Sequence, residues 1–352
     1  QNYEGKTALI SASESGQTCS VEHLINAGAN LDVKDDDGDT ALMVAAENGH
    51  VDCVELLIGA NADVNAQDVE SGWTALLLAI ENNKRECAQL LLRAKANLDA
   101  KETELGRNAL ILAVWKNNAE LAQLLLDAKA DVDAMGDLSD WTALIWAATH
   151  GHVDCVKLLI GAKVALDATD DWGKTALLLA VEHSQSDCLE LLIEAHADLE
   201  AHDTYGYTPL MLAADHGQVD SVQLLINAQA DIEAQDNDGR TALMLAAGEG
   251  ELASVELLTD AKADMEARDH DGRTALMLAA AKGRAECVAE LIDGKADVEA
   301  TDRHDTTALM LAAAGKDAED CVALLADAST IAARRPERKR RRASDACTPR
   351  DE

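Results

Sequence analysis

Short apolar stretches alternate with polar segments along residues 1–330, and the alternation has a fixed period. The segment Thr241–Ala247 reads TALMLAA and returns at Thr274–Ala280, 33 residues later. Ten such segments can be indexed by their first residue: Thr7, Thr40, Thr74, Asn108, Thr142, Thr175, Thr208, Thr241, Thr274 and Thr307. Every interval is 33 or 34 residues. This period predicts a solenoid of ten repeats rather than a globular domain with one pocket.

Within each repeat the pattern predicts a short helix, a tight turn, a longer helix and an exit loop. In the second repeat, Thr40 can cap a helix that runs through Ala46, and Gly49 ends that helix. The next helix, over 51–58, places four apolar residues on one face: Cys53, Val54, Leu57 and Ile58. So narrow a face cannot close a core alone, and we expect neighbouring repeats to supply the other half.

The residues inside the repeat resemble those of ankyrin repeats. The pattern D-x-x-G-x-T-A-L-x-L-A-A is followed by a glycine-centred turn, V-D-C-V-x-L-L-I and an A-x-A-D-V-x-A exit. Thr208-Pro209-Leu210 keeps the proline that is common in the family. The resemblance covers residues 1–330. It implies an all-α solenoid of ten stacked helix-turn-helix repeats with projecting β-turn loops, a scaffold that does not by itself fix function.

Two columns depart from the family pattern. The family usually has His where this chain has Met43, Leu77, Ile111, Ile145 and Met244, so we expect apolar packing there. The glycine that usually ends the second helix is replaced by Asn61, Lys95, Lys129, Lys163, His196, Gln229, Lys262 and Lys295. A left-handed backbone at these positions costs ~1 kcal/mol. Ser11, Ser13 and His23 stand in apolar slots of the first repeat, which predicts an outer capping repeat.

The charge is strongly and unevenly negative. The chain has 65 acidic and 30 basic residues, a formal net charge of -35. Residues 331–352 hold eight Arg or Lys and four Asp or Glu, so they carry +4 and the repeats carry -39. Such a body opposes nucleic acid and anionic membranes and favours a basic partner, although solvation of a long solenoid is the alternative explanation. The chain opens with Gln1 inside a loop, so we expect a piece of a longer protein.

Five of the eight cysteines occupy one slot of the repeat, near the start of the second helix: Cys53, Cys87, Cys155, Cys188 and Cys287. Equivalent slots of stacked helices are ~8–10 Å apart, beyond the ~7 Å limit for a disulfide. We therefore expect reduced cysteines that fill the core, and a protein of the cytoplasm or nucleus.

The sequence offers no convincing catalytic group. Gly5-Lys6-Thr7 and Gly173-Lys174-Thr175 have the last residues of a phosphate-binding loop but lack its earlier glycine. The histidines have no partner at metal-ligand spacing, and Asp35-Asp36-Asp37 is interpreted as loop solvation. We predict no catalytic residue, no metal and no cofactor.

The aromatic residues indicate a surface. In ankyrin repeats, partner contacts usually come from the loop beside the turn glycine and from the end of the first helix, and seven of the eight Trp and Tyr residues stand there. The exception, Trp146, occupies a Leu slot and is expected in the core. The predicted partner-binding residues are Trp73, Arg107, Trp115, Trp141, Trp172, Tyr205 and Tyr207. The alternative is that these side chains pack on neighbouring loops.

These features predict a non-catalytic, monomeric scaffold that binds another protein through the concave face and loop tips. Acidic residues around the aromatics suit a basic segment of the partner, through burial and cation–π contact. The alternative is a ligand-sensing or regulatory part of a larger enzyme. Gly72-Trp73-Thr74 and Lys116 fit an oligonucleotide sensor loosely, but the negative charge opposes phosphate.

Residues 331–352 lack the repeat and are expected to be a disordered basic tail. Five consecutive basic residues form a candidate nuclear-localisation signal: Arg338, Lys339, Arg340, Arg341 and Arg342. Ser344 follows two arginines at the spacing that basophilic kinases prefer, and its phosphorylation would add negative charge beside the signal. A tail that only increases solubility is the alternative.

Overall fold

The computed structural model describes residues 1–68, 70–136, 140–315 and 318–330. In these residues the regular structure is helical, apart from isolated antiparallel bridges such as Gln67 with Thr74. The chain divides into two compact units, Gln1–Ala195 and His196–Glu352, which we call unit one and unit two. Among the helices of the described residues, none is long and apolar enough to span a membrane.

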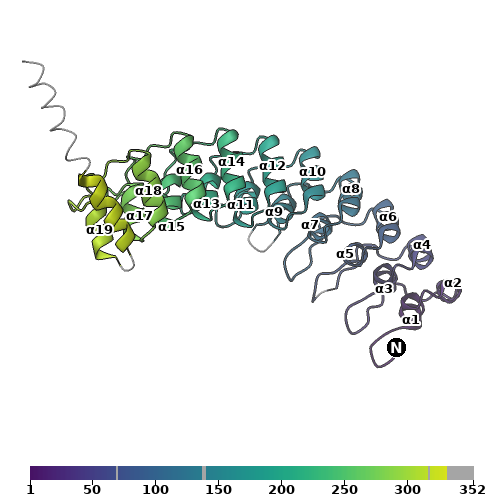
Figure 1. Cartoon of the computed structure of the whole chain (residues 1–352). Helices are drawn as coiled ribbons and strands as arrows, with labels where there is room; N and C mark the ends of the chain where they lie inside the picture. The colour runs from purple at the N-terminus through teal and green to yellow at the C-terminus, as the bar shows by residue number, and fades with distance from the viewer. Residues whose placement is uncertain (69, 137–139, 316–317, 331–352) are drawn as a thin grey trace, which may run out of the picture. The chain divides into compact units, whose positions relative to one another are not determined.

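Unit one is built from helix pairs in two rows (Figure 1). The first helices are α1 (Ala8–Glu14), α3 (Ala41–Asn48), α5 (Ala75–Glu81), α7 (Ala109–Trp115), α9 (Ala143–Thr149) and α11 (Ala176–Glu182). The second helices are α2 (Thr18–Asn26), α4 (Val51–Gly59), α6 (Arg85–Arg93), α8 (Ala119–Asp127), α10 (Val153–Gly161) and α12 (Ser186–Glu194). Each first helix packs on its own second helix, and the first helices from α1 to α9 each pack on the next first helix.

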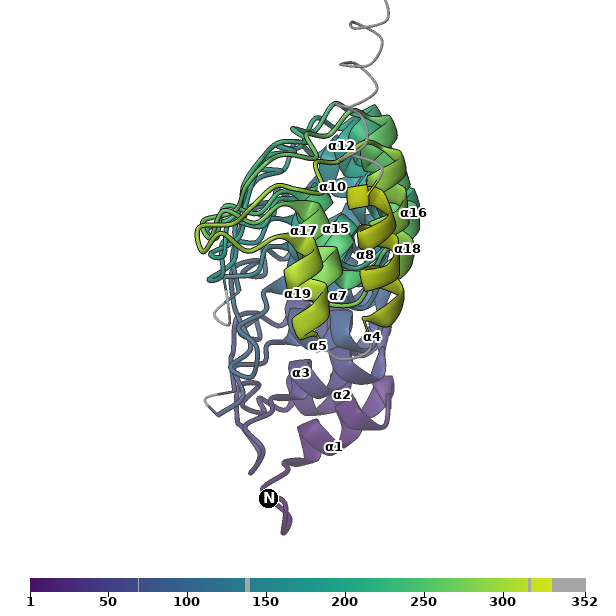
Figure 2. The same cartoon turned by 60° about the vertical axis from the view of Figure 1, so that its left-hand side comes forward.

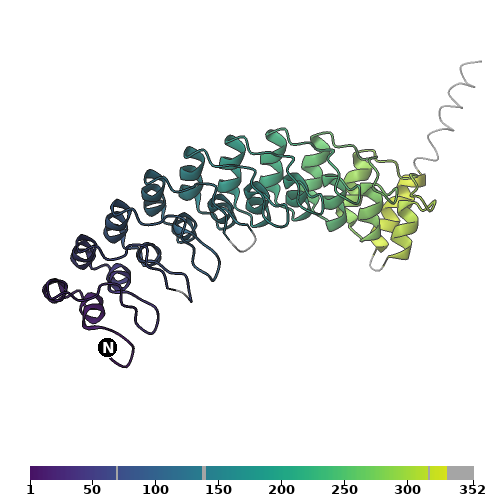
Figure 3. The same ribbon diagram turned by 180° about the vertical axis from the view of Figure 1, so that it is seen from behind.

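Unit two repeats this arrangement, and its two rows can also be followed from behind (Figure 3). Its first helices are α13 (Pro209–Asp215), α15 (Ala242–Glu249), α17 (Ala275–Ala281) and α19 (Ala308–Ala314). Its second helices are α14 (Val219–Asn227), α16 (Leu252–Asp260) and α18 (Ala285–Asp293), and residues 319–330 are also helical. The predicted all-α solenoid repeat is therefore confirmed within each unit.

The first helices begin where the sequence predicts. Thr40 has extended backbone, and its hydroxyl accepts the N–H of Met43 at 3.3 Å, so it caps α3. The helix runs to Asn48 rather than Ala46 and ends at Gly49, whose φ is 79°. Thr241 makes no such side-chain bond, and its buried hydroxyl has no hydrogen-bond partner. The first helices therefore begin after the repeated threonine even where its side chain makes no capping hydrogen bond.

The replaced glycines do adopt the left-handed conformation. φ is 64° at Asn61, 61° at Lys95 and 76° at Lys295, and the other five members of the column are also positive. Each position carries the backbone penalty expected for a side chain in that region. The N–H of Asn61 donates to the carbonyl of Ile58 at 3.0 Å, which satisfies an end group of α4.

The core consists of equivalent side chains of successive repeats, which are buried where adjacent repeats pack together. The slot that holds His in the family is apolar and buried from Ile10 to Met277, whereas Met310 in α19 is 57% exposed. The five aligned cysteines are free and at most 1% exposed, as predicted, and burial raises the pKa of Cys155 to about 11. Ser13 was expected on an outer face, but it is fully buried and its hydroxyl has no partner.

Candidate functional site

The residues predicted to bind a partner lie in the loops before the first helices and at the C-terminal ends of those helices. In each unit these loops project from one side of the helices (Figure 2). Four consecutive repeats of unit one each carry a tryptophan there, and we call these residues the aromatic face: Trp73, Trp115, Trp141 and Trp172. Tyr205 and Tyr207 take corresponding loop positions in unit two.

Most of these loops are organised by a carboxylate that is buried or partly buried, whereas the loop of Trp141 has Gly136 at that position. Asp35 is 8% exposed, and its Oδ1 accepts the N–H groups of Asp37 at 3.2 Å and Asp39 at 2.8 Å. The same two bonds recur at Asp170, Asp203, Asp236, Asp269 and Asp302. The interpretation of Asp35 as solvation is therefore wrong, although Asp36 and Asp37 are exposed. The D of the D-x-x-G-x-T pattern marks this structural role.

Arg107 lies under the aromatic face rather than on it. It is 4% exposed, and its Nε donates to Oε1 of Glu102 at 2.9 Å. Its guanidinium lies 4.3 Å from the ring centroid of Trp115, and the ammonium of Lys116 lies 4.7 Å from the same centroid. Lys116 is also ion-paired with Glu81. Because Arg107 is buried, it is poorly placed to contact a partner directly. It instead makes a cation–π contact with the half-buried Trp115.

Glu102 is the counter-charge of this arrangement. Its side chain is fully buried, and it accepts backbone N–H bonds from Glu104, Leu105 and Arg107. Burial alone raises the pKa of Glu102, but the bonds from the backbone and side chain of Arg107 and from the other N–H groups lower it overall. A charged carboxylate is thus maintained inside the loop.

Trp141 is part of a run of rings. Its centroid lies 4.7 Å from that of Trp146 in an edge-to-face contact, and Trp146 stacks on His150 at 5.3 Å. The expectation that Trp146 belongs to the core is wrong, because it is only half-buried. His152 continues the run and contacts the carbonyl of Val114 at 2.9 Å. Its pKa is lowered, mainly by burial.

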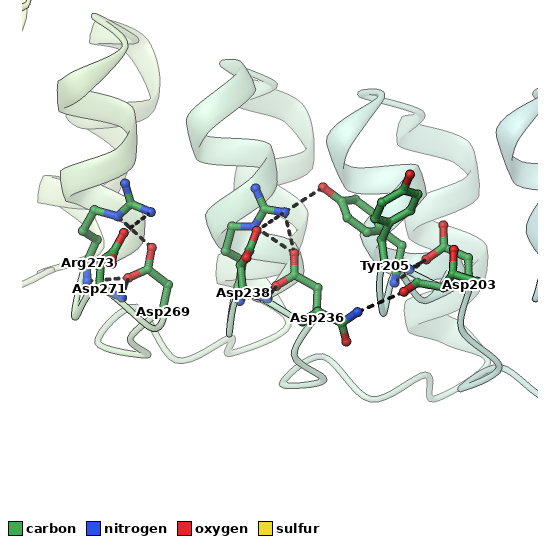
Figure 4. Close-up of polar contacts among 11 residues, drawn as sticks. Asp203, Tyr205, Asp236, Asp238, Asp269, Asp271 and Arg273 are labelled. Atoms are coloured by element: carbon green, nitrogen blue, oxygen red, sulfur yellow. Dashed lines mark hydrogen bonds and ion pairs between the residues drawn. The ribbon is translucent and has the colours of Figure 1, made fainter. Parts of the chain in front are cut away.

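Unit two places a cation, Arg240, against Tyr207. The loop carboxylates that flank this contact include Asp236 and Asp238 (Figure 4). Nη2 of Arg240 donates to the hydroxyl of Tyr207 at 3.2 Å, and its guanidinium lies 5.8 Å from the ring centroid. The same guanidinium pairs with the buried Asp236 at 2.8 Å and the exposed Asp238 at 3.2 Å. Tyr207 is therefore half-buried and held from the side, while Tyr205 is 69% exposed.

The second repeat has a carboxylate in a slot where five other repeats have a cation. In this slot Lys6 pairs with Glu14 at 3.0 Å, and Lys174 pairs with Glu182 at 2.6 Å. Asp39 occupies the slot in the second repeat. Burial, followed by the nearby carboxylates of Asp35, Glu47, Asp68 and Asp37, raises the pKa of Asp39 to about 6. Ionised Asp39 is therefore a source of instability.

We expect Asp39→Asn to stabilise the protein at neutral pH. The folded pKa of Asp39 lies above its ordinary value of 3.8, so wild-type stability falls as pH rises through about 6. The variant should gain about 1 kcal/mol above that pH, a figure discounted for partial exposure, and the gain should vanish near pH 4. Urea unfolding across this range measures it, with Glu55→Gln, an exposed charge removed from α4, as control. A gain independent of pH would contradict the assignment.

The comparison with known families is decisive for the scaffold. A family model described as ankyrin repeats (3 copies) matches residues 1–68, 61–136, 132–203, 195–269 and 255–334. The chain belongs to the ankyrin-repeat family.

Among solved structures, this ankyrin-repeat chain resembles the ankyrin repeat domain of Bcl-3, described as a unique member of the IkappaB protein family. The two are 29% identical with a TM-score of 0.59, and the match covers 63% of this chain and 99% of that one. No curated protein sequence matches the chain. Ankyrin repeats are generally protein-interaction modules, and their fold is generally non-catalytic.

Three further candidate features remain: the phosphate-loop-like segments, a metal site and a surface hollow. The two lysines of the phosphate-loop-like segments are the ion-paired Lys6 and Lys174. In the described ranges, no group of three or more His, Cys, Asp or Glu side chains is arranged to hold a metal ion. An open hollow of about 750 Å³ lies on the outer side of α1 and α2, beside Ser11 and His23. It contains none of the aromatic face, and its lining includes the exposed thiol of Cys19.

The tail predictions lie outside the described residues. They concern Arg338, Lys339, Arg340, Arg341 and Arg342 as a nuclear signal and Ser344 as a phosphorylation site, and they stay predictions.

Proposed function

We propose that this ankyrin-repeat chain is a non-catalytic scaffold that binds a segment of another protein along the aromatic face of unit one. The observation that carries the proposal is the exposure of Trp172, which is 53% accessible at the tip of a loop. Trp73, Trp115 and Trp141 are half-buried on the same side of the preceding repeats. Large aromatic side chains that stay accessible on a rigid scaffold are the residues most enriched at binding hot spots.

The charges around this face favour a basic partner segment. Its cations are already neutralised, because Lys116 pairs with Glu81 and Lys174 donates two hydrogen bonds to Glu182 at 2.6 and 2.7 Å. Exposed carboxylates remain at the loop tips: Glu70, Asp140 and Asp171. The face therefore presents apolar rings in a negative field, which suits Arg- or Lys-bearing chains.

A sensor of phosphate ligands, as in a regulatory part of a larger enzyme, fits less well. Its candidate cation Lys116 is ion-paired and lies over the ring of Trp115, so it is not directed toward a free phosphate. The repeats also carry -39, which repels polyanions.

Selection from a random 12-residue peptide library on the immobilised chain tests the proposal. Selected peptides should include basic ones, and Trp172→Ala should weaken their binding by about 2 kcal/mol, close to thirtyfold, with unchanged helical circular dichroism. Val219→Ala removes an exposed apolar side chain at the start of a second helix and serves as control. Selected peptides that bind Trp172→Ala as tightly as wild type, or preferred binding of a short oligonucleotide, would refute the proposal.

A further inference from the structure

Trp172 is the most exposed of the tryptophans, at 53%. Trp115 is covered by Arg107 and Lys116, and Trp141 is packed on Trp146. Within the described part of the chain, no cation and no aromatic ring lies over Trp172. Its backbone is nevertheless fixed, because its N–H donates to Oδ1 of Asp170 at 2.9 Å. The loop therefore holds Trp172 by a backbone hydrogen bond while about half of the residue stays accessible to solvent.

The loop that carries Trp141 departs from the other loops of unit one at one position. Asp140 stands two residues before its helix cap, where the other repeats of unit one have glycine: Gly5, Gly38, Gly72, Gly106 and Gly173. All five glycines have positive φ, and so has Asp140, at 54°. A side chain with a Cβ is strained in this left-handed region, so Asp140 costs stability at a position where glycine would cost little.

The place that the Asp140 side chain must occupy follows from the other loops. A Cβ added to Gly206 would lie 2.8 Å from the backbone nitrogen of Asn237, and one added to Gly5 would meet Asp36. In both cases the neighbour is the residue that follows the buried aspartate of the next loop. For Asp140 that residue is Asp171, so two exposed carboxylates meet beside Trp172.

The pKa of Asp171 agrees with a position close to Asp140. The pKa of Asp171 is raised, by desolvation first and then by the charge and hydrogen bonding of Asp140. Lys174, the cation of the same loop, is committed to Glu182. Strain, crowding and like charge thus coincide at one point of the aromatic face, and a cation from outside the chain would relieve the charge repulsion.

We propose that Trp172, Asp140 and Asp171 form an anchor site for one arginine side chain of the bound segment. This inference rests on the proposed function. The guanidinium stacks on the ring of Trp172 and donates to the two carboxylates, as Arg240 contacts Tyr207, Asp236 and Asp238 in unit two. Arginine fits better than lysine, because its planar fork can stack and reach two acceptors together.

Isothermal titration with nona-arginine and nona-lysine at physiological ionic strength tests this site. Both peptides carry the same charge, so bulk attraction to the acidic repeats is matched. Wild type should bind nona-arginine about fivefold tighter than nona-lysine. Trp172→Ala and Asp171→Asn should abolish this preference, whereas Glu190→Gln, an exposed charge removed from a second helix, should leave it intact.

Asp140→Gly gives the sharpest readout, because the two expected effects have opposite signs. Restoring the glycine should raise the melting temperature, since it removes backbone strain and like charge, while it reduces the preference for nona-arginine. Equal binding of both peptides by wild type, no binding, or a preference that survives Trp172→Ala would overturn the anchor. Library-selected peptides that need Trp172 but lack arginine would overturn it too and leave the proposed function standing.

Discussion

Replacing Glu102 with alanine should lower the free energy of unfolding by about 3–5 kcal/mol, the range for breaking a buried ion pair. The substitution leaves the guanidinium of Arg107 buried without its counter-charge, although Nη1 of Arg107 already lacks a hydrogen-bond partner. It also removes the acceptor of three backbone N–H groups in the loop. Urea unfolding followed by circular dichroism measures the loss.

Glu104→Ala is the matched control for this prediction. Glu104 is an exposed glutamate two residues away in the same loop, and its loss should cost less than about 1 kcal/mol. Similar effects of the two substitutions would show that Glu102 contributes only surface charge. The fluorescence of Trp115 adds a local readout, because Arg107 lies 4.3 Å from its ring and should move in Glu102→Ala.

Met277→Ala should cost about 2–5 kcal/mol, whereas Met310→Ala should cost less than about 1 kcal/mol. The two methionines occupy the same slot of successive first helices, α17 and α19. Met277 is 1% exposed because α15 and α19 pack on either side of α17, while Met310 is 57% exposed. Because the same substitution is made at equivalent positions, the difference between the two losses of stability measures the contribution of packing by a following repeat.

Denaturant unfolding of both variants measures this contribution. The protein is built of repeats, so unfolding can depart from a single transition, and probes in unit two are needed beside the overall helical signal. Equal losses at Met277 and Met310 would mean that stacking on both sides adds nothing to the stability of a repeat.

Much of the fold is predictable because one pattern recurs ten times. Period and internal sequence together locate the helix starts, the left-handed column from Asn61 to Lys295 and the burial of the aligned cysteines. Each of these depends on local backbone chemistry or on a slot that adjacent repeats share. The family match and the helices confirm the scaffold that this pattern indicates.

The candidate site is less predictable because it depends on departures from the pattern. The sequence predicts Arg107 to be a surface cation, whereas the structure buries it in an ion pair with Glu102. Trp146 occupies a Leu slot, but its ring is too large to be enclosed there and packs on Trp141 instead. The column of buried loop carboxylates was visible in the sequence, yet charge alone suggested solvation. Asp140 in a glycine position is the departure that sequence comparison between repeats could have found.

The most direct test of the central claim is a hydrogen–deuterium exchange footprint of a library-selected peptide on the whole chain. The account predicts slower exchange on binding in the loop 170–174 and at the C-terminal ends of α7, α9 and α11, with little change in α8, α10 and α12. Because amide exchange reports local opening, a bound segment that bridges adjacent loops should protect them together. Protection confined to the second helices, or to the hollow beside α1 and α2, would contradict the assignment of the aromatic face as the binding surface.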